Sequence, residues 1–224
     1  MMQRAMRTAG ACGLFPGRRT ATWGALGTIV GAVALAGCQG TPEIDPDAPL
    51  VWVSMDTSMG QIVVELDRVH APVSVDNFLR YVDEGAYEGT IFHRVVREFV
   101  IQGGGHTVDL AELPGHEPIA NEWLNGLKNT RGTIAMARET EPDSATRQWY
   151  INVTDNPRLD TPREVTGNAG YAVFGRVVEG MDVVDAIRAV EVHTAEGPEG
   201  VPMQNVPVDP VVLRSVKRVR QPGE

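Results

Sequence analysis

The sequence predicts a mainly β fold, a closed eight-stranded antiparallel barrel capped by two α-helices. Short runs rich in Val, Ile and aromatic residues recur along the chain, while only two stretches have helical periodicity. Long loops containing Gly and Pro separate these runs, and strands do not alternate regularly with helices. This pattern favours an antiparallel barrel over a doubly wound parallel sheet.

The order of elements follows from turn residues and periodicity. Strands at 50–55 and 60–66 are joined by "DTSMG", which supplies the Asp, Ser and Gly of a hairpin turn. A helix begins at Pro72 and ends at Gly85, because apolar residues between them recur at i, i+3, i+4 and i+7. The second helix is predicted at 181–189. The remaining strands are predicted at 90–96, 99–103, 132–137, 148–153, 172–178 and 208–216.

The N-terminal region differs in composition from the rest of the chain. Residues 1–37 contain four arginines and no acidic residue, and end in an uncharged stretch of small apolar residues, as in a signal peptide. The sequence "LAGC" closes this stretch and resembles a lipobox, so Cys38 is predicted to carry lipid after cleavage. An uncleaved membrane anchor and an ordinary secretory signal remain alternatives. Residues 38–49 are predicted to be a flexible tether.

Size and charge limit the possible functions. The chain has 224 residues, of which 42% are hydrophobic, and its formal net charge is −9. This is enough for one domain, predicted at 50–219 and followed by a tail at 220–224. Nucleic acid is not expected as a partner, because no basic face is visible. The two cysteines lie at 12 and 38, so the mature domain must be stabilised by its core rather than by a disulfide.

Several catalytic motifs are absent. After Gly103 and Gly105 the third glycine of a dinucleotide-binding fingerprint is replaced by Val108. The five histidines have no partner at metal-ligand spacing, and neither a GxSxG motif nor a second thiol in the mature chain offers a nucleophile. We therefore expect a reaction that needs no metal, no cofactor and no covalent intermediate.

Four long segments carry a resemblance to a known family. They are "FHRVVREFVIQGGG" at 92–105, "NEWLNGLKNTRGTIAMAR" at 121–138, "DSATRQWYINVTDNPRLD" at 143–160 and "GYAVFGRVVEGMDVVDAI" at 170–187. Together they resemble the cyclophilins, peptidyl-prolyl cis/trans isomerases, and most of all the bacterial periplasmic branch. The resemblance extends over nearly all of residues 50–217 and implies the barrel with a helix over each end.

The resemblance also implies the site. Arg94 matches the family's catalytic arginine, whose guanidinium is suited to donating a hydrogen bond to the proline nitrogen. Gln102 would hold Arg94 or bind the substrate backbone, while Gln148 and the main chain of Arg138 would bind the residues preceding proline. The remaining substrate-binding positions are Phe99, Val100, Ala137, Tyr150, Leu159 and Tyr171. Taken singly, Phe99, Val100 and Leu159 would each be better explained as ordinary core residues.

Three departures from the family pattern affect the expected activity. Arg97-Glu98 replaces the usual "PG", and "RQWY" at 147–150 replaces "SQFF". Arg158 stands where cyclosporin recognition is associated with a tryptophan, which predicts weak inhibition by that drug. The predicted function is a monomeric isomerase, anchored to a membrane through Cys38 in the cell envelope, that acts on proline-containing segments of exported proteins. The alternative is a partner-binding cyclophilin module with weak or no isomerase activity.

Overall fold

The structure is a computed structural model that describes residue 45 and residues 47–223. The predicted signal peptide at 1–37, Cys38 and most of the tether lie outside the described residues. No helix within the described part of the chain is long and apolar enough to span a membrane.

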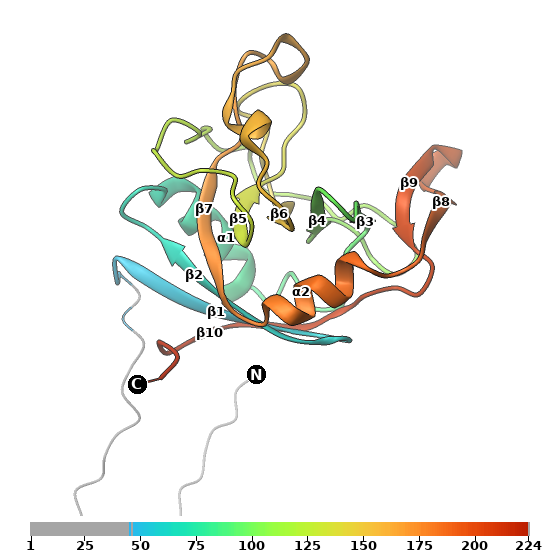
Figure 1. The fold of residues 1–224 in the computed structure, drawn as a ribbon, viewed down its shortest axis with the longest axis horizontal. Coiled ribbons are helices and arrows are strands. Elements are labelled where there is room, and N and C mark those ends of the chain that lie inside the picture. Colours follow the sequence, from blue (N-terminus) through green and yellow to red (C-terminus); the bar gives the residue numbers. More distant parts are fainter. Residues whose placement is uncertain (1–44, 46, 224) are drawn as a thin grey trace, which may run out of the picture. The chain divides into compact units, whose positions relative to one another are not determined.

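An eight-stranded antiparallel sheet forms the framework of the fold (Figure 1). Its strands follow the order β10-β1-β2-β7-β5-β6-β4-β3. The bounds are Leu50–Thr57 for β1, Gly60–Asp67 for β2, Arg94–Val95 for β3, Val100–Gly103 for β4, Thr133–Met136 for β5, Trp149–Asn152 for β6, Val173–Glu179 for β7 and Leu213–Val219 for β10.

The sheet curls into an open half-barrel, and the closed barrel predicted from the sequence is not shown. The hydrogen-bonded ladder ends at β3, which has only two residues instead of the seven predicted at 90–96. Between the two edges, a single bridge joins Ile91 to Val212, just before β3 and β10. This contact is too short to continue the ladder around the barrel.

The predicted hairpin at the start of the domain is confirmed. β1 and β2 pair in register from Leu50 opposite Asp67 to Thr57 opposite Gly60. The Thr57 hydroxyl donates to the Gly60 carbonyl over 2.7 Å and accepts from the Met59 amide over 3.0 Å. Gly60 has φ +135°, a conformation that a side chain would strain, so the glycine fits this turn.

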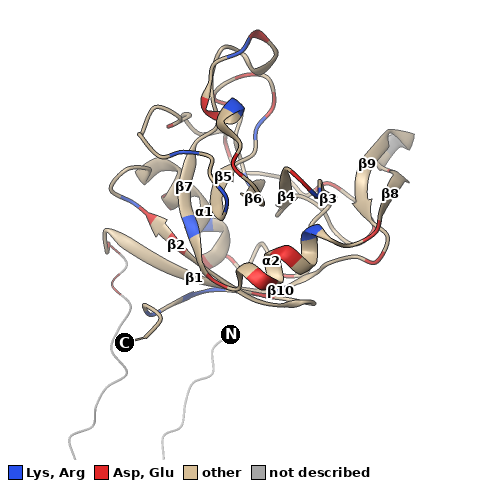
Figure 2. Ribbon diagram, viewed as in Figure 1, with Lys and Arg blue, Asp and Glu red and all other residues tan. Residues whose placement is uncertain are grey.

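Both predicted helices are present. α1 (Pro72–Asp83) has a proline in its first turn and buries its apolar stripe, including Val75 and Phe78, against the sheet. α2 (Met181–Arg188) buries Val184 and Ile187 completely. As Figure 2 shows, α2 carries acidic residues in its early turns and a basic residue at its end, the arrangement that its dipole favours.

A second, two-stranded sheet was not predicted. It consists of β8 (Val192–Glu196) and β9 (Pro202–Pro207). The final strand, β10, begins five residues later than the predicted 208. β8 is largely exposed and lacks an apolar alternation, while prolines bound β9 and the turn between the strands. The sequence of such a segment indicates a loop, because proline is tolerated only at strand ends and on edge strands.

Successive side chains of β4, β5 and β6 point to opposite faces of the sheet, where they belong to two different apolar clusters. Ile101, Ile134 and Ile151 point into the main core, which also contains Trp149 of β6 and Phe78 of α1. Their neighbours in sequence point to the opposite face of the sheet. There the second cluster contains Val100, Ala135, Tyr150, Leu159 and Val173, with Phe99, Leu127, Ala137 and Tyr171 packed around it.

Candidate active site

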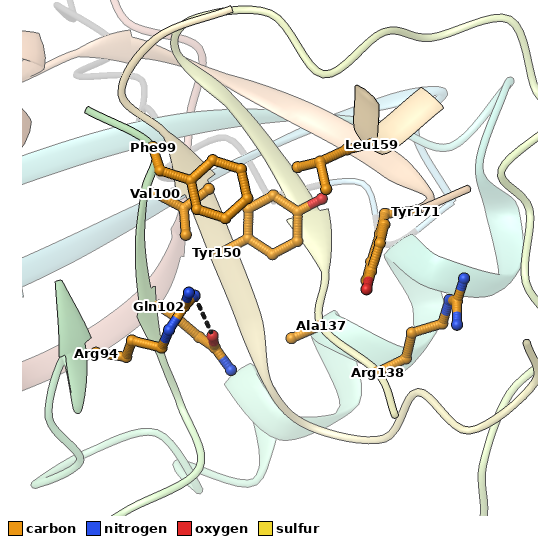
Figure 3. A pocket seen from close by; sticks show the side chains of 9 residues that line it. All are labelled: Arg94, Phe99, Val100, Gln102, Ala137, Arg138, Tyr150, Leu159 and Tyr171. Atoms are coloured by element: carbon orange, nitrogen blue, oxygen red, sulfur yellow. Dashed lines mark hydrogen bonds between the residues drawn. The ribbon is translucent and has the colours of Figure 1, made fainter. Parts of the chain in front are cut away.

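A cavity of about 180 Å³ opens over the second cluster (Figure 3). Its lining residues are Arg94, Phe99, Val100, Gln102, Ala137, Arg138, Tyr150, Leu159 and Tyr171. The structure thus brings together all but one of the predicted catalytic and substrate-binding side chains. The exception, Gln148, lines an adjoining cavity of about 140 Å³ that shares Gln102, Ala137 and Arg138 with the first.

Arg94 and Gln102 face each other across neighbouring strands. The antiparallel register of β3 and β4 places Arg94 directly opposite Gln102, so both side chains emerge on the cavity face. Arg94 Nη1 donates to Gln102 Oε1 over 3.4 Å, as drawn in Figure 3. Gln102 Nε2 in turn donates to Gln148 Oε1 over 2.9 Å. The side-chain amide of Gln102, itself bound to that of Gln148, therefore holds the Arg94 guanidinium at the mouth of the cavity.

The charge on Arg94 has no counterion among the described residues. None of the ion pairs formed in that part of the chain includes it. Burial lowers the pKa of Arg94, and the nearby Tyr171 opposes this effect, but a guanidinium stays protonated near neutral pH. Its Cζ lies 5.8 Å from the centre of the Phe99 ring. Donor capacity therefore remains for a ligand in the cavity.

Aromatic rings form the floor and one wall of the cavity. Tyr150 is nearly fully buried and meets Tyr171 edge to face, with ring centres 6.1 Å apart. The Arg138 guanidinium lies 4.5 Å from the Tyr171 ring centre and donates to the carbonyls of Thr166, Ala169 and Gly170. The side chain of Arg138 thus fixes the wall of the cavity, which leaves its main chain as the predicted contact for a substrate.

A buried asparagine below the cavity was missed by the sequence analysis. Asn129 accepts from the Tyr150 hydroxyl and donates to Asp160 Oδ1 from both its amide groups, over 2.9 Å from N and 2.8 Å from Nδ2. Another asparagine, Asn156, donates to the Phe99 carbonyl over 2.9 Å. The tyrosine at 150 was the one feature of the sequence that signalled a buried polar partner, since a buried hydroxyl needs one.

Of the departures from the family pattern, Tyr150 lies in the floor of the cavity, and the other replaced residues lie around it. Arg147 is buried and donates to the carbonyls of Gly104, Pro114 and Ala86, so it fastens the long 104–120 loop. Arg158 is exposed beside Leu159 and is not among the lining residues.

The turn before Phe99 is held by the end of α2. Arg188 Nη1 donates to the Arg97 carbonyl over 3.3 Å and lies 3.6 Å from the Glu98 carboxylate. The "RE" pair that replaces the usual "PG" is thus tied to a helix.

Two histidines next to this site were also missed. His93 and His106 are both buried, and their ring centres lie 4.2 Å apart. Burial, reinforced by the neighbouring His106 and Arg94, lowers the pKa of His93 to about 3. Burial also lowers the pKa of His106. Both rings are therefore neutral at pH 7 and add no charge beside Arg94.

These features together define a class of protein. An apolar slot with room for a small ring, bordered by an uncompensated guanidinium and by the side-chain amides of Gln102 and Gln148, is suited to an extended peptide with one buried ring. The slot lies on the outer face of a curled antiparallel sheet. This arrangement is typical of a protein that binds peptides on the face of a β-sheet.

Comparison with known proteins identifies the family. A family model described as "Cyclophilin type peptidyl-prolyl cis-trans isomerase/CLD" matches residues 52–217, and the chain belongs to this family. Over 165 residues it is 51% identical to peptidyl-prolyl cis-trans isomerase cyp18 of Streptomyces antibioticus, covering 74% of this chain and 96% of that protein. It is 49% identical to peptidyl-prolyl cis-trans isomerase B of Escherichia coli over 164 residues, 73% and 97% of the two chains.

Solved structures show the same fold. The crystal structure of a cyclophilin-type isomerase of Cryptosporidium parvum matches with a TM-score of 0.62 at 22% identity, covering 77% of this chain and 99% of that one. A second structure of that protein, in the presence of the dipeptide Ala-Pro, gives a TM-score of 0.61. The predicted enzyme class is confirmed: the chain is a cyclophilin-type peptidyl-prolyl cis-trans isomerase.

Proposed function

We propose that this isomerase is anchored in the cell envelope and acts on X-Pro bonds of exported proteins, with Arg94 as its catalytic donor. The observation that carries the catalytic assignment is the uncompensated Arg94 guanidinium, held by Gln102 beside an apolar slot.

The reaction requires rotation about an amide bond. The barrier is ~18–20 kcal/mol, because the C–N bond has partial double-bond character. A donor to the proline nitrogen favours a pyramidal nitrogen, which has lost its resonance with the carbonyl. Arg94 would therefore stabilise the twisted state more than either planar state, as catalysis requires.

The slot would hold the proline ring during rotation. Phe99, Val100, Tyr150 and Leu159 offer apolar contacts on several sides. Burial of ~100 Å² of a pyrrolidine contributes roughly 2–3 kcal/mol, which fits brief binding of many substrates. Gln148 and the main chain near Arg138 would bind the residues that precede proline in an extended conformation.

Catalysis can be tested on a refolding reaction limited by proline isomerisation. We expect the protein, extracted from membranes in mild detergent, to accelerate the slow refolding phase of an exported substrate protein. Refolding of the same substrate without its critical proline should not respond. If the slow phase keeps its uncatalysed rate at equimolar enzyme, the proposed action on exported proteins is wrong.

The envelope assignment depends on the leader and on Cys38. Four arginines, an uncharged stretch and "LAGC" occur in the order of a lipoprotein signal, and the "QGTPEIDPDAP" that follows is suited to a tether. In a bacterial host, labelled fatty acid should enter the wild-type protein and the Cys12→Ser control, but not Cys38→Ser. Unlabelled wild-type protein would exclude the lipid anchor.

A further inference from the structure

The polar chain that begins at Arg94 continues beyond the proline slot. Gln148, which accepts from Gln102, directs its own Nε2 toward Glu112 Oε1 at 3.5 Å. Glu112 lines the 140 Å³ cavity together with Gln148. It also lines a third cavity of about 410 Å³. The three cavities therefore follow one another, and Glu112 lies between the second and the third.

The third cavity lies between the 104–120 loop and the β8–β9 hairpin. Its lining residues are His106, Glu112, Pro198, Val201 and Met203. At the base of the hairpin, β9 packs against β3, the strand that carries Arg94, and Figure 1 shows the two side by side. The hairpin therefore lies next to β3 and forms the side of the third cavity that is opposite the 104–120 loop.

The lining of this cavity combines one negative charge with apolar surface. Among the described residues that form it, Glu112 is the only charged one, and Val201 is 60% exposed. His106 contributes a buried, neutral ring, since burial lowers its pKa. The nearby cation, Arg147, is occupied by the carbonyls of Gly104, Pro114 and Ala86. A positive group that entered the cavity would meet an exposed carboxylate and no competing charge from the lining.

We propose that the third cavity is a subsite for a lysine or arginine side chain of the substrate polypeptide, upstream of the proline. The aliphatic stem of such a residue would pack on Val201 and Met203, and its charged head would reach Glu112 while staying hydrated. An acidic residue would be repelled by Glu112, and a purely apolar one would gain no electrostatic contact with the carboxylate. This inference rests on the proposed function, because it places the residues preceding proline on the Gln148 side.

The test uses a series of proline peptides that differ at one position. A lysine, a norleucine or a glutamine is placed at each of the second to sixth positions before proline, and kcat/KM is measured for each peptide. Wild type should prefer lysine over glutamine by about three- to fivefold at one register, the size expected of an exposed ion pair. Norleucine should fall between them, because it retains the stem without the charge.

Two variants separate the subsite from general attraction to an acidic protein. In Glu112→Gln the ratio of lysine to glutamine peptides should fall to about one, and in Val201→Ser the advantage of norleucine over glutamine should disappear. Asp109→Asn removes an exposed charge from the same loop outside the cavity lining and should keep the wild-type ratio. Each ratio is taken within one variant, so a change in basal activity does not affect it.

The outcomes distinguish this inference from the function on which it rests. Turnover of all peptides without a lysine preference, a lysine preference of equal size at every position, or an equal loss in Asp109→Asn would overturn the subsite and leave the isomerase intact. If wild type turned over no peptide of the series, the proposed function would fail and the subsite with it.

Discussion

Tyr150 donates its hydroxyl proton to Asn129 Oδ1 over 2.7 Å beneath the proline slot. Burial raises the pKa of Tyr150 well above its usual value, so the hydroxyl remains a donor at physiological pH. Asn129 also donates to Asp160, beside the slot residue Leu159. One buried side chain therefore connects the floor of the slot with its wall.

Removing the acceptor should damage both stability and substrate binding. In Asn129→Ala the Tyr150 hydroxyl is left buried without this partner, which we expect to lower the free energy of unfolding by ~1–3 kcal/mol and to raise KM more than it lowers kcat. Urea unfolding and steady-state kinetics measure the two effects.

The matched control is Tyr150→Phe, which removes the hydroxyl itself. In this background the additional cost of Asn129→Ala should be smaller by ~1 kcal/mol, since the shared hydrogen bond is already absent. Strictly additive costs would show that the two residues act independently.

Arg94→Ala should reduce kcat/KM by about two to three orders of magnitude, ~3–4 kcal/mol of transition-state stabilisation, while the protein stays folded. Arg94→Lys should recover only part of the activity, because a lysine keeps the charge but not the planar fork. Arg97→Ala removes an exposed arginine of the next turn and should remain near wild type. An Arg94→Ala enzyme within threefold of wild type would remove Arg94 from the mechanism.

Cyclosporin should inhibit this enzyme poorly. Arg158 is exposed beside Leu159, and its hydrated head cannot supply the apolar contact or the directed N–H of an indole. Arg158→Trp should therefore lower the inhibition constant by a factor of about thirty, as expected for one aromatic anchor worth ~2 kcal/mol. Arg158→Ala is the control and should gain little. Tight inhibition of the wild type would contradict this account.

Acid should destabilise the protein through its buried histidines. The pKa of His93 is about 3 in the folded state, below its ordinary value of 6.5, so the unfolded state binds the extra proton. The free energy of unfolding should be unaffected by this group above pH 6.5. It should fall by about 1.4 kcal/mol per pH unit between roughly pH 6 and 4.

His93→Gln should reduce this slope by about 1.4 kcal/mol per pH unit, the contribution of one proton, because it removes the titrating ring. His193→Gln, at an exposed position, should leave the slope as it is. Denaturant unfolding at several pH values measures both, and an unchanged slope in His93→Gln would show that His93 does not control the acid transition.

The sequence predicted those parts of the fold and site that depend on periodicity and on long motifs. α1 and α2 were visible because their buried residues recur every three or four positions. The cavity residues were found because the four matched segments place them, although only the register of β3 with β4 shows why Arg94 meets Gln102.

Contacts between distant segments could not be predicted in the same way. Glu122 accepts from the amides of Val73 and Ser74 and so caps α1 from a loop almost fifty residues away, and no local pattern signals such a cap. The β8–β9 hairpin was missed because its exposed, proline-bounded strands lack an apolar face. The asparagines below the slot carry no periodicity at all.

The short length of β3 affects how this protein can handle polypeptides that have not folded. A free sheet edge invites pairing with any extended chain, which leads to aggregation. At one edge of this sheet, β3 offers only two residues, Arg94 and Val95, and β9 packs against it. At the other edge, β10 carries Arg214 and Lys217, charges that discourage pairing. An extended segment bound in the proposed slot would therefore not be captured as an additional strand.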